Sequence, residues 1–449
     1  MIEQASAGCD VVVIGAGMGG LTAAALLSKA GLAVQVVEMD ARPGGYLVGF
    51  ERGGFRFDTA ILWLNQCGPG GSVRRTLDYI APGAPETPPL RHIRRYKGES
   101  FDYLLTDPPD ALRDRLIADF PAERAGLLSF FAAARKVGGA FEAVQDYTRT
   151  RDTWSAWDYL RSLGAAWHGL KFLRYLGLST EDGLGRFFRD PRLRSVFCSE
   201  VNLVSCLVPI GWAYHGDFQA PPSGGSSALP AFLARAVLGH GGAVHFGCRV
   251  TDVLLEGRRA AGVRYQNGSG APKEIRSRYV IAACDLETLY ERALPPGTIA
   301  PELLERLRGA QLYPSSATVW LGLDRPAQEL GFGEELVFLT RDGDSRASHN
   351  STDPRTSAIS VLAPSVRDAS LAPAGKGALM FSVSAQLAYG DAWQTEEGLK
   401  RGPAYRAFKQ AFADVLIDRV AHSLCPALRE HIALTEVATP VTHWRYTGN

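Results

Sequence analysis

A glycine-rich turn between a short apolar strand and an alanine-rich helix constrains this chain more than any other feature. Residues 10–15 (DVVVIG) are typical of a buried parallel strand, residues 19–30 predict a helix, and residues 33–38 (AVQVVE) predict the next strand. The turn at residues 15–20 (GAGMGG) fits the spacing G-x-G-x-x-G. In this strand–turn–helix context, the pattern predicts a dinucleotide-binding βαβ unit.

The glycines of the turn have separate physical roles. Gly15 permits the tight turn, Gly17 lets the backbone approach a pyrophosphate, and Gly20 lets the helix and strand pack closely. The pyrophosphate would lie at the helix N-terminus, where free N–H groups and the helix dipole favour anions. Met18 and Gly19 lie between these glycines and belong to the predicted site.

A second glycine turn follows the second strand. Glu38 ends that strand, at the position where an acidic residue accepts hydrogen bonds from ribose hydroxyls and repels a 2′-phosphate. The next residues (MDARPGG) form an R-x-G-G element, in which a cation and two glycines suit further phosphate or an isoalloxazine ring near the backbone. A plain NAD domain has no need of this element, so a different dinucleotide is favoured.

Composition excludes several classes of protein. The 48 Lys and Arg residues nearly balance the 47 Asp and Glu residues, which argues against nucleic-acid binding by phosphate neutralisation. A hydrophobic content of 46% is typical of a globular chain and too high for a disordered one. A length of 449 residues predicts two or three domains.

Cysteine usage and the first residues favour a reducing cytoplasm. The seven cysteines are odd in number and never fall as C-x-x-C, and the start (MIEQASAGCD) lacks a secretory signal. The nine histidines show no metal-binding spacing, so no metal site is predicted. His92, His168 and His215 fall in the predicted substrate domain, but each is more often an ordinary histidine than a base. No catalytic residue is therefore assigned.

The rest of the chain divides into an α/β part and a more helical part. A helix at 230–238 is followed by strands at 243–246, 249–255, 260–265 and 279–283. Between them, residues 90–218 have a helical and strongly aromatic character. Residues 317–323 predict a strand and residues 400–424 a helix in a third region.

The order of these motifs resembles the flavin-dependent phytoene desaturase and carotenoid isomerase family, within the amine-oxidase-like flavoprotein superfamily. The resemblance is carried by GAGMGGLTAAALLSKAG, VVEMDARPGG, GGFRFD, PSGGSSALP, GGAVHFGCRVTDVLLEGRRAAGVRY, YVIAACD and ATPVTHWRYTGN, which occur in this order. One departure is that Thr59-Ala60 follows Phe57-Asp58, where the family usually has a Gly-Pro or Gly-Ser step. This departure therefore leaves open a substrate or reaction type other than phytoene desaturation.

The resemblance implies an α/β fold with a Rossmann-like FAD-binding domain (parallel sheet with β-meander) and an inserted α+β substrate domain. Residues 1–90, 220–290 and 425–449 are assigned to the FAD-binding domain, and residues 91–219 and 291–424 to the substrate and membrane-associating domain. The resemblance implies noncovalent FAD. Its predicted cofactor-binding residues are Gly15, Gly17, Met18, Gly19, Gly20, Glu38, Met39, Arg42, Gly44, Gly45, Phe57, Asp58, Thr59 and Val250.

The leading functional hypothesis is hydride transfer between a long polyene or isoprenoid and flavin N5, with desaturation as the favoured direction. Quinone or oxygen would then accept the electrons. Reduction of a double bond and cis–trans isomerisation remain open, as does an amine-oxidase-like reaction on a small polar substrate. A prenyl-binding escort-type protein is the non-enzymatic alternative, although the intact R-x-G-G and Glu38 argue against it.

Two further expectations concern the surroundings of the protein. Because the substrate is membrane-soluble, we expect peripheral membrane contact, with Val201 to Trp212 as the contacting segment. In the resembled family the chain continues beyond a segment like RYTGN and closes over the flavin, whereas this sequence stops at Asn449. We therefore expect weak FAD binding by this chain alone, or a second polypeptide that completes the site.

Overall fold

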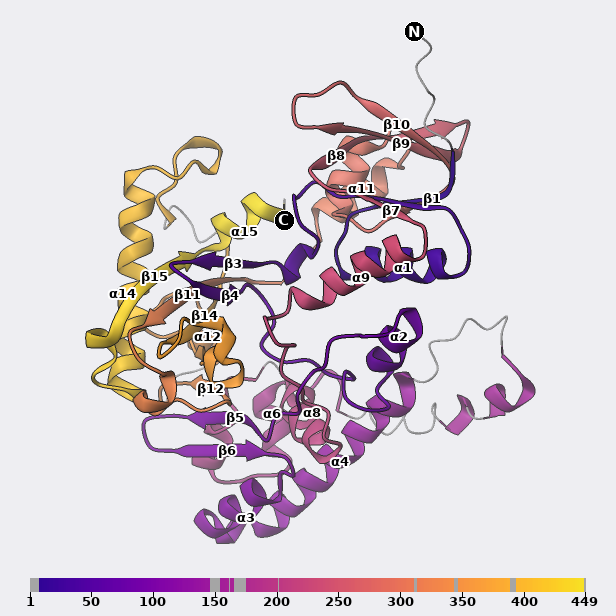
Figure 1. Cartoon of the computed structure of the whole chain (residues 1–449). Coiled ribbons are helices and arrows are strands. Elements are labelled where there is room, and N and C mark those ends of the chain that lie inside the picture. Colours follow the sequence, from indigo (N-terminus) through magenta and orange to yellow (C-terminus); the bar gives the residue numbers. More distant parts are fainter. Residues whose placement is uncertain are drawn as a thin grey trace.

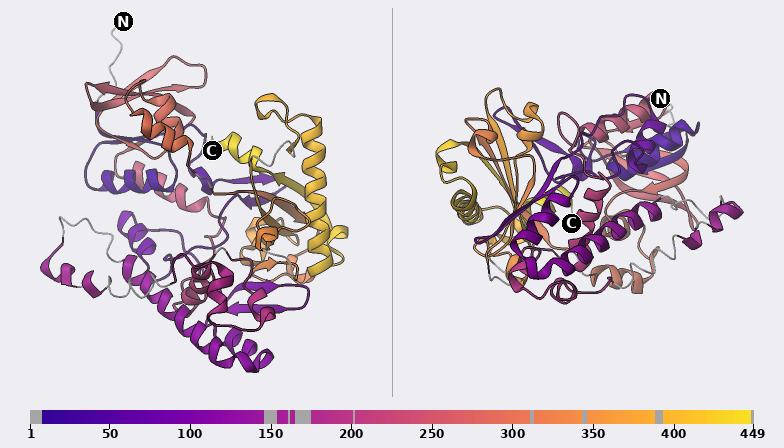
Figure 2. Two further views of the ribbon diagram at one scale, coloured as in Figure 1. Left: turned by 180° about the vertical axis from the view of Figure 1, so that it is seen from behind. Right: turned by 90° about the horizontal axis from the view of Figure 1, so that it is seen from below.

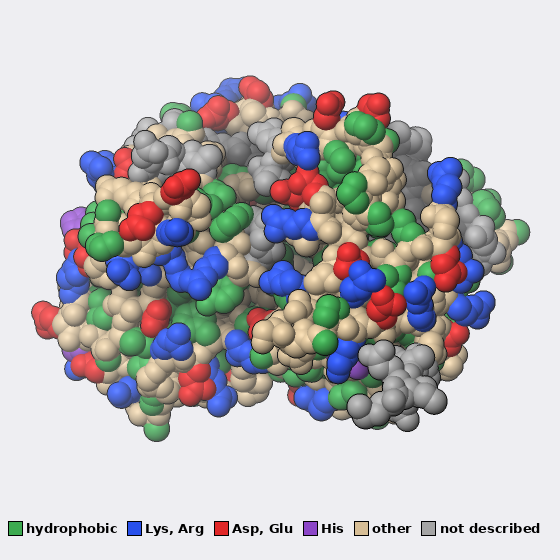
Figure 3. Space-filling model, turned by 90° about the horizontal axis from the view of Figure 1, so that it is seen from above, with side chains coloured by type: hydrophobic (Ala, Val, Ile, Leu, Met, Phe, Trp, Pro, Cys, Tyr) green, Lys and Arg blue, Asp and Glu red, His purple; other side chains and the backbone are tan. Residues whose placement is uncertain are grey.

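The computed structural model describes residues 8–145, 154–160, 162–164, 175–200, 202–310, 313–342, 346–387 and 393–447. A six-stranded sheet and a seven-stranded sheet organise these residues, together with a two-stranded hairpin. The two sheets lie in opposite halves of the molecule (Figure 1). Seen from above, a hollow runs between the halves, and Lys and Arg side chains lie along its sides (Figure 3).

The six-stranded sheet has the order β7-β2-β1-β10-β9-β8. The first four strands in this order run parallel, and β10, β9 and β8 form an antiparallel meander. The strands are β1 (Cys9–Ile14), β2 (Val34–Val37), β7 (Ala243–His245), β8 (Cys248–Glu256), β9 (Arg259–Asn267) and β10 (Lys273–Ala282). The predicted Rossmann-like parallel sheet with a meander is confirmed.

The side chains of β1 point alternately to the two faces of this sheet, and both faces are covered by other parts of the protein. Val11 and Val13 face the helices α1 (Met18–Lys29), α2 (Ser72–Ile80) and α9 (Ala228–Gly239). Val12 and Ile14 face the cluster under the meander. Successive side chains of a strand point to opposite faces, so a run of Val and Ile without polar interruption fits a sheet buried on both sides.

A short hairpin joins the two halves. It consists of β3 (Gly49–Arg52) and β4 (Phe55–Asp58), and Phe55 and Phe57 pack against Trp320 of the seven-stranded sheet. The indole Nε1–H of Trp320 donates to the carbonyl oxygen of Asp58 at 2.9 Å. The hairpin therefore fixes the residues after the second glycine turn against the other sheet.

The seven-stranded sheet has the order β15-β11-β14-β13-β12-β5-β6, and only β12 and β5 pair in parallel among its described strands. Its strands are β5 (His92–Lys97), β6 (Asp102–Thr106), β11 (Ser315–Leu323), β12 (Leu336–Leu339), β13 (Ile359–Leu362), β14 (Gly377–Ala385) and β15 (Ile432–Ala438). Val319 and Leu321 face the long helix α14 (Pro403–Leu424), which lies on the outer side of this half (Figure 2). Trp320 faces the hairpin instead.

A layer of helices packs beneath β5 and β6. It comprises α3 (Asp110–Asp119), α4 (Arg124–Gln145), α6 (Thr180–Gly185), α7 (Pro191–Ser195) and α8 (Leu203–Tyr214). Tyr96 and Leu105 from the sheet share one core with Phe130 and Phe197 from this layer. Other described helices are α10 (Leu286–Thr288), α11 (Pro301–Arg308), α12 (Arg346–His349), α13 (Pro364–Arg367) and α15 (Pro440–Thr447), and residues 156–160 and 162–164 are helical as well.

Three predictions about this half need correction or lie beyond the described residues. Residues 90–218 are not wholly helical, since β5 and β6 form two strands of the sheet. Residues 432–438, which the sequence assigned to the FAD-binding domain, pair with β11 as β15 of the other sheet. His168 lies outside the described residues.

The segment predicted to contact a membrane is buried within the protein. Leu203, Leu207 and Ile210 of α8 are fully buried in the core shared with α4, and Val201 lies outside the described residues. The prediction for this segment is therefore wrong, because an apolar helix can be covered by protein as well as by lipid. Within the described ranges, no helix combines the length and apolar character that crossing a bilayer requires.

Candidate functional site

The first glycine turn joins β1 to α1 at the carboxyl end of the parallel strands. Gly15 has a φ of +101°, and a Cβ there would lie 2.6 Å from the carbonyl oxygen of Ala283 at the end of β10. A Cβ on Gly20 would lie 2.2 Å from the carbonyl oxygen of Gly15. Both positions therefore require glycine for the helix to pack against the turn.

The N-terminus of α1 has the properties of an anion-binding site. Gly17 precedes the helix, and no side chain caps this end. A Cβ built on Gly17 or Gly19 meets no described atom within 4 Å, so the space in front of the helix is open. The residues here fit the pyrophosphate of a dinucleotide, which would take the free N–H groups of Met18 and Gly19 as donors.

Glu38 has a structural role that the sequence did not predict. Its carboxylate accepts hydrogen bonds from the backbone N–H groups of Ala16 and Asp40, both at 2.7 Å, and the residue is 8% exposed. These bonds hold the first turn against the end of β2. Each carboxylate oxygen has two lone pairs, so the predicted contact with ribose remains compatible with this arrangement.

The second glycine turn lies directly beside the first. The N–H of Gly44 donates to the carbonyl oxygen of Ala16 at 2.9 Å, and Gly44 forms a bridge with Gly17. Gly44 and Gly45 both have positive φ values. Elements from separate parts of the N-terminal sequence thus form one glycine-lined edge, as a dinucleotide site requires.

Other predicted residues surround this edge. Arg42 is exposed and its Nη1 donates to the carbonyl oxygen of Gly49 at 3.2 Å. Met39 is 46% exposed. Val250 lies near the start of β8, where the N–H of Cys248 donates to the carbonyl oxygen of Glu38. The structure brings these three residues near the end of β2, and their contact with FAD remains a prediction.

The residues after the hairpin have different environments. The ring of Phe57 is 1% exposed and packs against Phe50 and Phe55, so its side chain serves the core. The hydroxyl of Thr59 donates to the carbonyl oxygen of Val48 at 2.6 Å. The carboxylate of Asp58 accepts from the N–H of Ser226 at 3.0 Å and from its hydroxyl at 2.9 Å.

A small cavity lies beside Asp58, between the hairpin and the seven-stranded sheet. Its walls are largely apolar, and they include Ile61, Pro222, Trp320, Leu362 and Met380. Because the hairpin and the glycine turn at 224–225 border it, the cavity lies where the two halves of the molecule meet. Its volume is about 20 Å³, close to the space that one water molecule requires.

Arg367 is the one cation among the described residues on the wall of this cavity, and the sequence did not indicate it. Its Nε donates to the carbonyl oxygen of Glu334 at 2.7 Å and its Nη1 donates to that of Leu62. Burial lowers the pKa of Arg367 to about 10, against the opposing effect of two glutamates. Within the described residues, its Nη2 has no hydrogen-bond partner.

The described histidines give no catalytic assignment. His92 lies exposed on β5, and its backbone N–H donates to the carboxylate of Glu334 at 2.8 Å. His215 ends α8 in the helical layer. No group of three or more potential metal ligands occurs in the described part of the chain.

We expect Asp58→Asn to change how stability depends on pH. Burial raises the pKa of Asp58, the bonds from Ser226 oppose the shift, and the charge of Asp368 adds to it. The native state therefore binds this proton more readily than the unfolded chain does. Relative to the variant, the wild type should gain free energy of unfolding as the pH falls through the raised pKa, and level off below the ordinary value of 3.8.

Urea unfolding of both proteins at a series of pH values measures this difference. The asparagine side chain of the variant keeps an oxygen that can accept from Ser226, so the fold should persist. Asp190→Asn is the control with the opposite sign, because a hydrogen bond from Arg192 lowers the pKa of Asp190. There, the wild type should lose stability relative to the variant as the pH falls. A pH-independent difference for Asp58→Asn would contradict the prediction.

The parallel sheet and the adjoining glycine turns define a protein with a dinucleotide-binding fold. The chain matches the flavin containing amine oxidoreductase family over residues 18–416, and it belongs to that family. This confirms the resemblance drawn from the sequence and implies FAD as the cofactor.

Curated relatives match nearly the whole chain at low identity. All-trans-retinol 13,14-reductase of Danio rerio is 24% identical over 97% of this chain and 76% of its own length. Prolycopene isomerase of Daucus carota is 24% identical over 97% and 70%. The zeta-carotene-forming phytoene desaturase of Myxococcus xanthus is 28% identical over 100% and 84%. The chain is thus a flavin oxidoreductase related to carotenoid desaturases and retinol reductases.

A solved structure supports the fold. An oxidoreductase from Methanosarcina mazei superposes with a TM-score of 0.62 at 18% identity, covering 96% of this chain and 88% of that one. The similarity extends over both halves of the molecule. The predicted fold class, a Rossmann-like FAD-binding part with an inserted α+β part, is confirmed.

Proposed function

We propose that this chain is an FAD-dependent oxidoreductase that desaturates a long apolar polyene or isoprenoid. The observation that carries the proposal is the cavity beside Asp58, whose walls are mainly aliphatic and proline side chains. At about 20 Å³ the cavity is too small to hold such a chain as it stands, so the chemistry of its walls, and not its size, supports the proposal. A hydrocarbon suits these walls because it has no polar groups to leave unpaired on burial. The names of the three relatives, all acting on polyenes, support the same substrate class.

The residues of the chain would bind, orient and shield the reactants. The N-terminus of α1 and the turn at Gly44-Gly45 would hold the dinucleotide, and Glu38 would accept from its ribose. FAD supplies a carrier that can accept or donate hydride. The aliphatic walls would align the substrate and exclude water, while a proton lost in desaturation would pass to water or a weak base. Quinone or oxygen is the proposed electron acceptor.

Other reactions on the same site make distinct predictions. An amine oxidase acting on a small polar substrate would be expected to show an enclosed polar or aromatic cage. Most of the residues described on the cavity wall are aliphatic or proline, with Trp320 as the one aromatic residue and Asp58, Arg367 and Asp368 as the charged ones. Reduction and isomerisation of a polyene would involve the same apolar contacts with the substrate. Desaturation starts from oxidised FAD, whereas reduction of a double bond starts from reduced FAD, and isomerisation proceeds without net redox change. Substrate class and direction can therefore be tested separately.

Anaerobic spectroscopy of the FAD-loaded protein tests the proposal. Phytoene in detergent is expected to bleach the absorbance of oxidised flavin, whereas putrescine should not. Dithionite-reduced protein mixed with lycopene or retinol tests the reductive direction, and the appearance of an isomer without bleaching tests isomerisation. Free FAD in the same detergent is the control. Bleaching by putrescine but by no polyene would overturn the proposed substrate class.

A further inference from the structure

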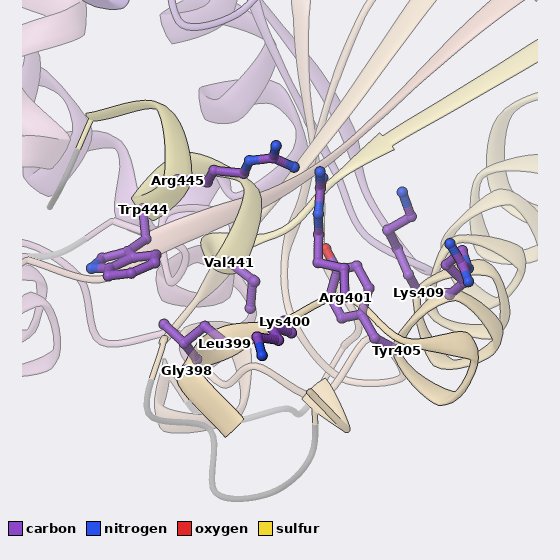
Figure 4. A pocket seen from close by; sticks show the side chains of 10 residues that line it. Gly398, Leu399, Lys400, Arg401, Tyr405, Lys409, Val441, Trp444 and Arg445 are labelled. Carbon is purple, nitrogen blue, oxygen red and sulfur yellow. The ribbon is translucent and has the colours of Figure 1, made fainter. Parts of the chain in front are cut away.

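A large open pocket lies at the edge of the seven-stranded sheet, between the segment before α14 and the last helix, α15. Its volume is about 610 Å³. Half of its ten lining residues carry a positive charge: Lys400, Arg401, Arg406, Lys409 and Arg445. Arg445 extends from α15 toward the guanidinium group of Arg401 on the opposite wall (Figure 4). None of these residues belongs to the cofactor site described above.

The five cations of the pocket outnumber the acidic residues near it, of which Glu396 and Glu397 directly precede Gly398 and the backbone of Glu396 bridges to that of Lys400. No Asp or Glu lines the pocket, and none of its five cations forms an ion pair with another described residue. By contrast, Arg429 beyond the far end of α14 pairs with both Asp414 and Asp418. Glu436 is near Lys409 but pairs with Arg52 at 3.5 Å. The concave shape therefore concentrates a net positive field.

The walls of the pocket are held in place by hydrogen bonds. The hydroxyl of the buried Tyr405 lies 2.8 Å from that of Thr439 and 3.3 Å from that of Thr442, which ties α14 to α15. The ammonium of Lys409 donates to the carbonyl oxygen of Val437 at 3.3 Å. Burial lowers the pKa of Lys409, with Glu436 opposing the shift. These bonds fix the two helices that carry Arg406, Lys409 and Arg445, whereas Lys400 and Arg401 lie on the segment before α14.

We infer that this pocket binds a phosphate-bearing anion. Five cations offer more donors than one carboxylate can accept, whereas a phosphate or diphosphate presents enough oxygens to meet them from several sides. Val441 and the 37% exposed Trp444 add an apolar wall for an organic group attached to the phosphate. The same chemistry is offered by a soluble diphosphate and by the headgroup of an anionic phospholipid. The inference is independent of the proposed polyene reaction.

Calorimetry and vesicle sedimentation test the inference on the full chain loaded with FAD, so that the pyrophosphate site at α1 is filled. Inorganic pyrophosphate is the soluble probe. Vesicles of phosphatidylcholine, with and without phosphatidylglycerol, are the lipid probe. Saturable binding of either probe is expected, and Arg401→Gln/Arg445→Gln should weaken it about a hundredfold, since each charged hydrogen-bond donor contributes roughly tenfold.

A control variant with the same change in net charge distinguishes binding in the pocket from general attraction by the charge of the protein. Arg258→Gln/Arg259→Gln removes two exposed cations from the β8–β9 turn and should leave binding unchanged. Binding of pyrophosphate alone identifies a soluble ligand, and binding of phosphatidylglycerol vesicles alone identifies a headgroup. The inference is overturned if the wild type binds neither probe, or if both double variants bind equally well. Urea unfolding of each variant confirms that the fold is kept.

Discussion

Gly17→Ala is expected to weaken FAD binding roughly tenfold to a hundredfold while leaving the fold of the apoprotein intact. The backbone of Gly17 is extended, which alanine also adopts, and a Cβ there meets no described protein atom within 4 Å. That Cβ would instead occupy the space where a pyrophosphate approaches the turn. Overpacking of about 1–3 kcal/mol corresponds to the stated loss of affinity.

Gly20→Ala, three residues away, should destabilise the apoprotein itself. Its Cβ would lie 2.2 Å from the carbonyl oxygen of Gly15, so the turn and α1 must move apart. The apoprotein should lose about 1–3 kcal/mol of stability, and FAD binding should fall with it. Gly19→Ala is the matched control for the stability of the apoprotein, because a Cβ there meets no described atom within 4 Å.

Two measurements decide between these outcomes. Fluorescence titration with FAD gives the affinity of each variant relative to the wild type, and urea unfolding without FAD gives the stability. Wild-type affinity in Gly17→Ala would show that the pyrophosphate does not lie against this turn. Unchanged stability in Gly20→Ala would show that the close contact with Gly15 can relax without cost.

The parts of this fold that could be predicted are those fixed by local sequence. An apolar strand, a glycine turn and an alanine-rich helix within residues 9–29 contain the contacts that define the start of a βαβ unit, and the structure has them. The meander of β8, β9 and β10 is likewise made of strands that are neighbours in sequence. For these elements, hydrophobic period and turn residues carry the information.

The remaining features depend on partners that are distant in the sequence. Apolar character alone could not reveal that α8 is covered by α4 rather than by lipid. The strand β5 (HIRRYK) contains three charged residues, and its pairing with β12 comes from residues far along the chain. Arg367 donates a hydrogen bond to the carbonyl oxygen of Leu62, which lies 305 positions earlier in the sequence. No local pattern signals such contacts.

Arg94→Met is expected to destabilise the protein by about 3–5 kcal/mol, the second large effect that the structure predicts. Arg94 of β5 is 5% exposed and pairs with the carboxylate of Glu200, which is also buried. The guanidinium lies over the ring of Phe338, 4.3 Å from its centre. Removing Arg94 would leave the charge of Glu200 in a low-dielectric environment without this partner.

An exposed ion pair provides the matched control. Arg115 and Asp119 of α3 form a bond of 3.0 Å, with 71% and 33% of their side chains exposed. Because water screens such a pair, Arg115→Met should change the free energy of unfolding by less than about 1 kcal/mol. Urea unfolding of both variants in the same buffer compares a buried and an exposed arginine directly.

The double variant Arg94→Met/Glu200→Met tests whether the ion pair stabilises the folded protein. The alternative is that the attraction between the two charges only offsets the free energy lost when both are buried. Two buried charges lose hydration when the helical layer closes over β5, and their attraction recovers only part of that loss. We therefore expect the double variant to recover most of the stability lost in Arg94→Met, since two methionines fill the space without a charge. If the double variant is as unstable as the single one, the ion pair itself holds the helical layer to the sheet. The hydroxyl of Thr180, which donates to the carbonyl oxygen of Glu200 at 2.7 Å, keeps the backbone of this segment in place in either case.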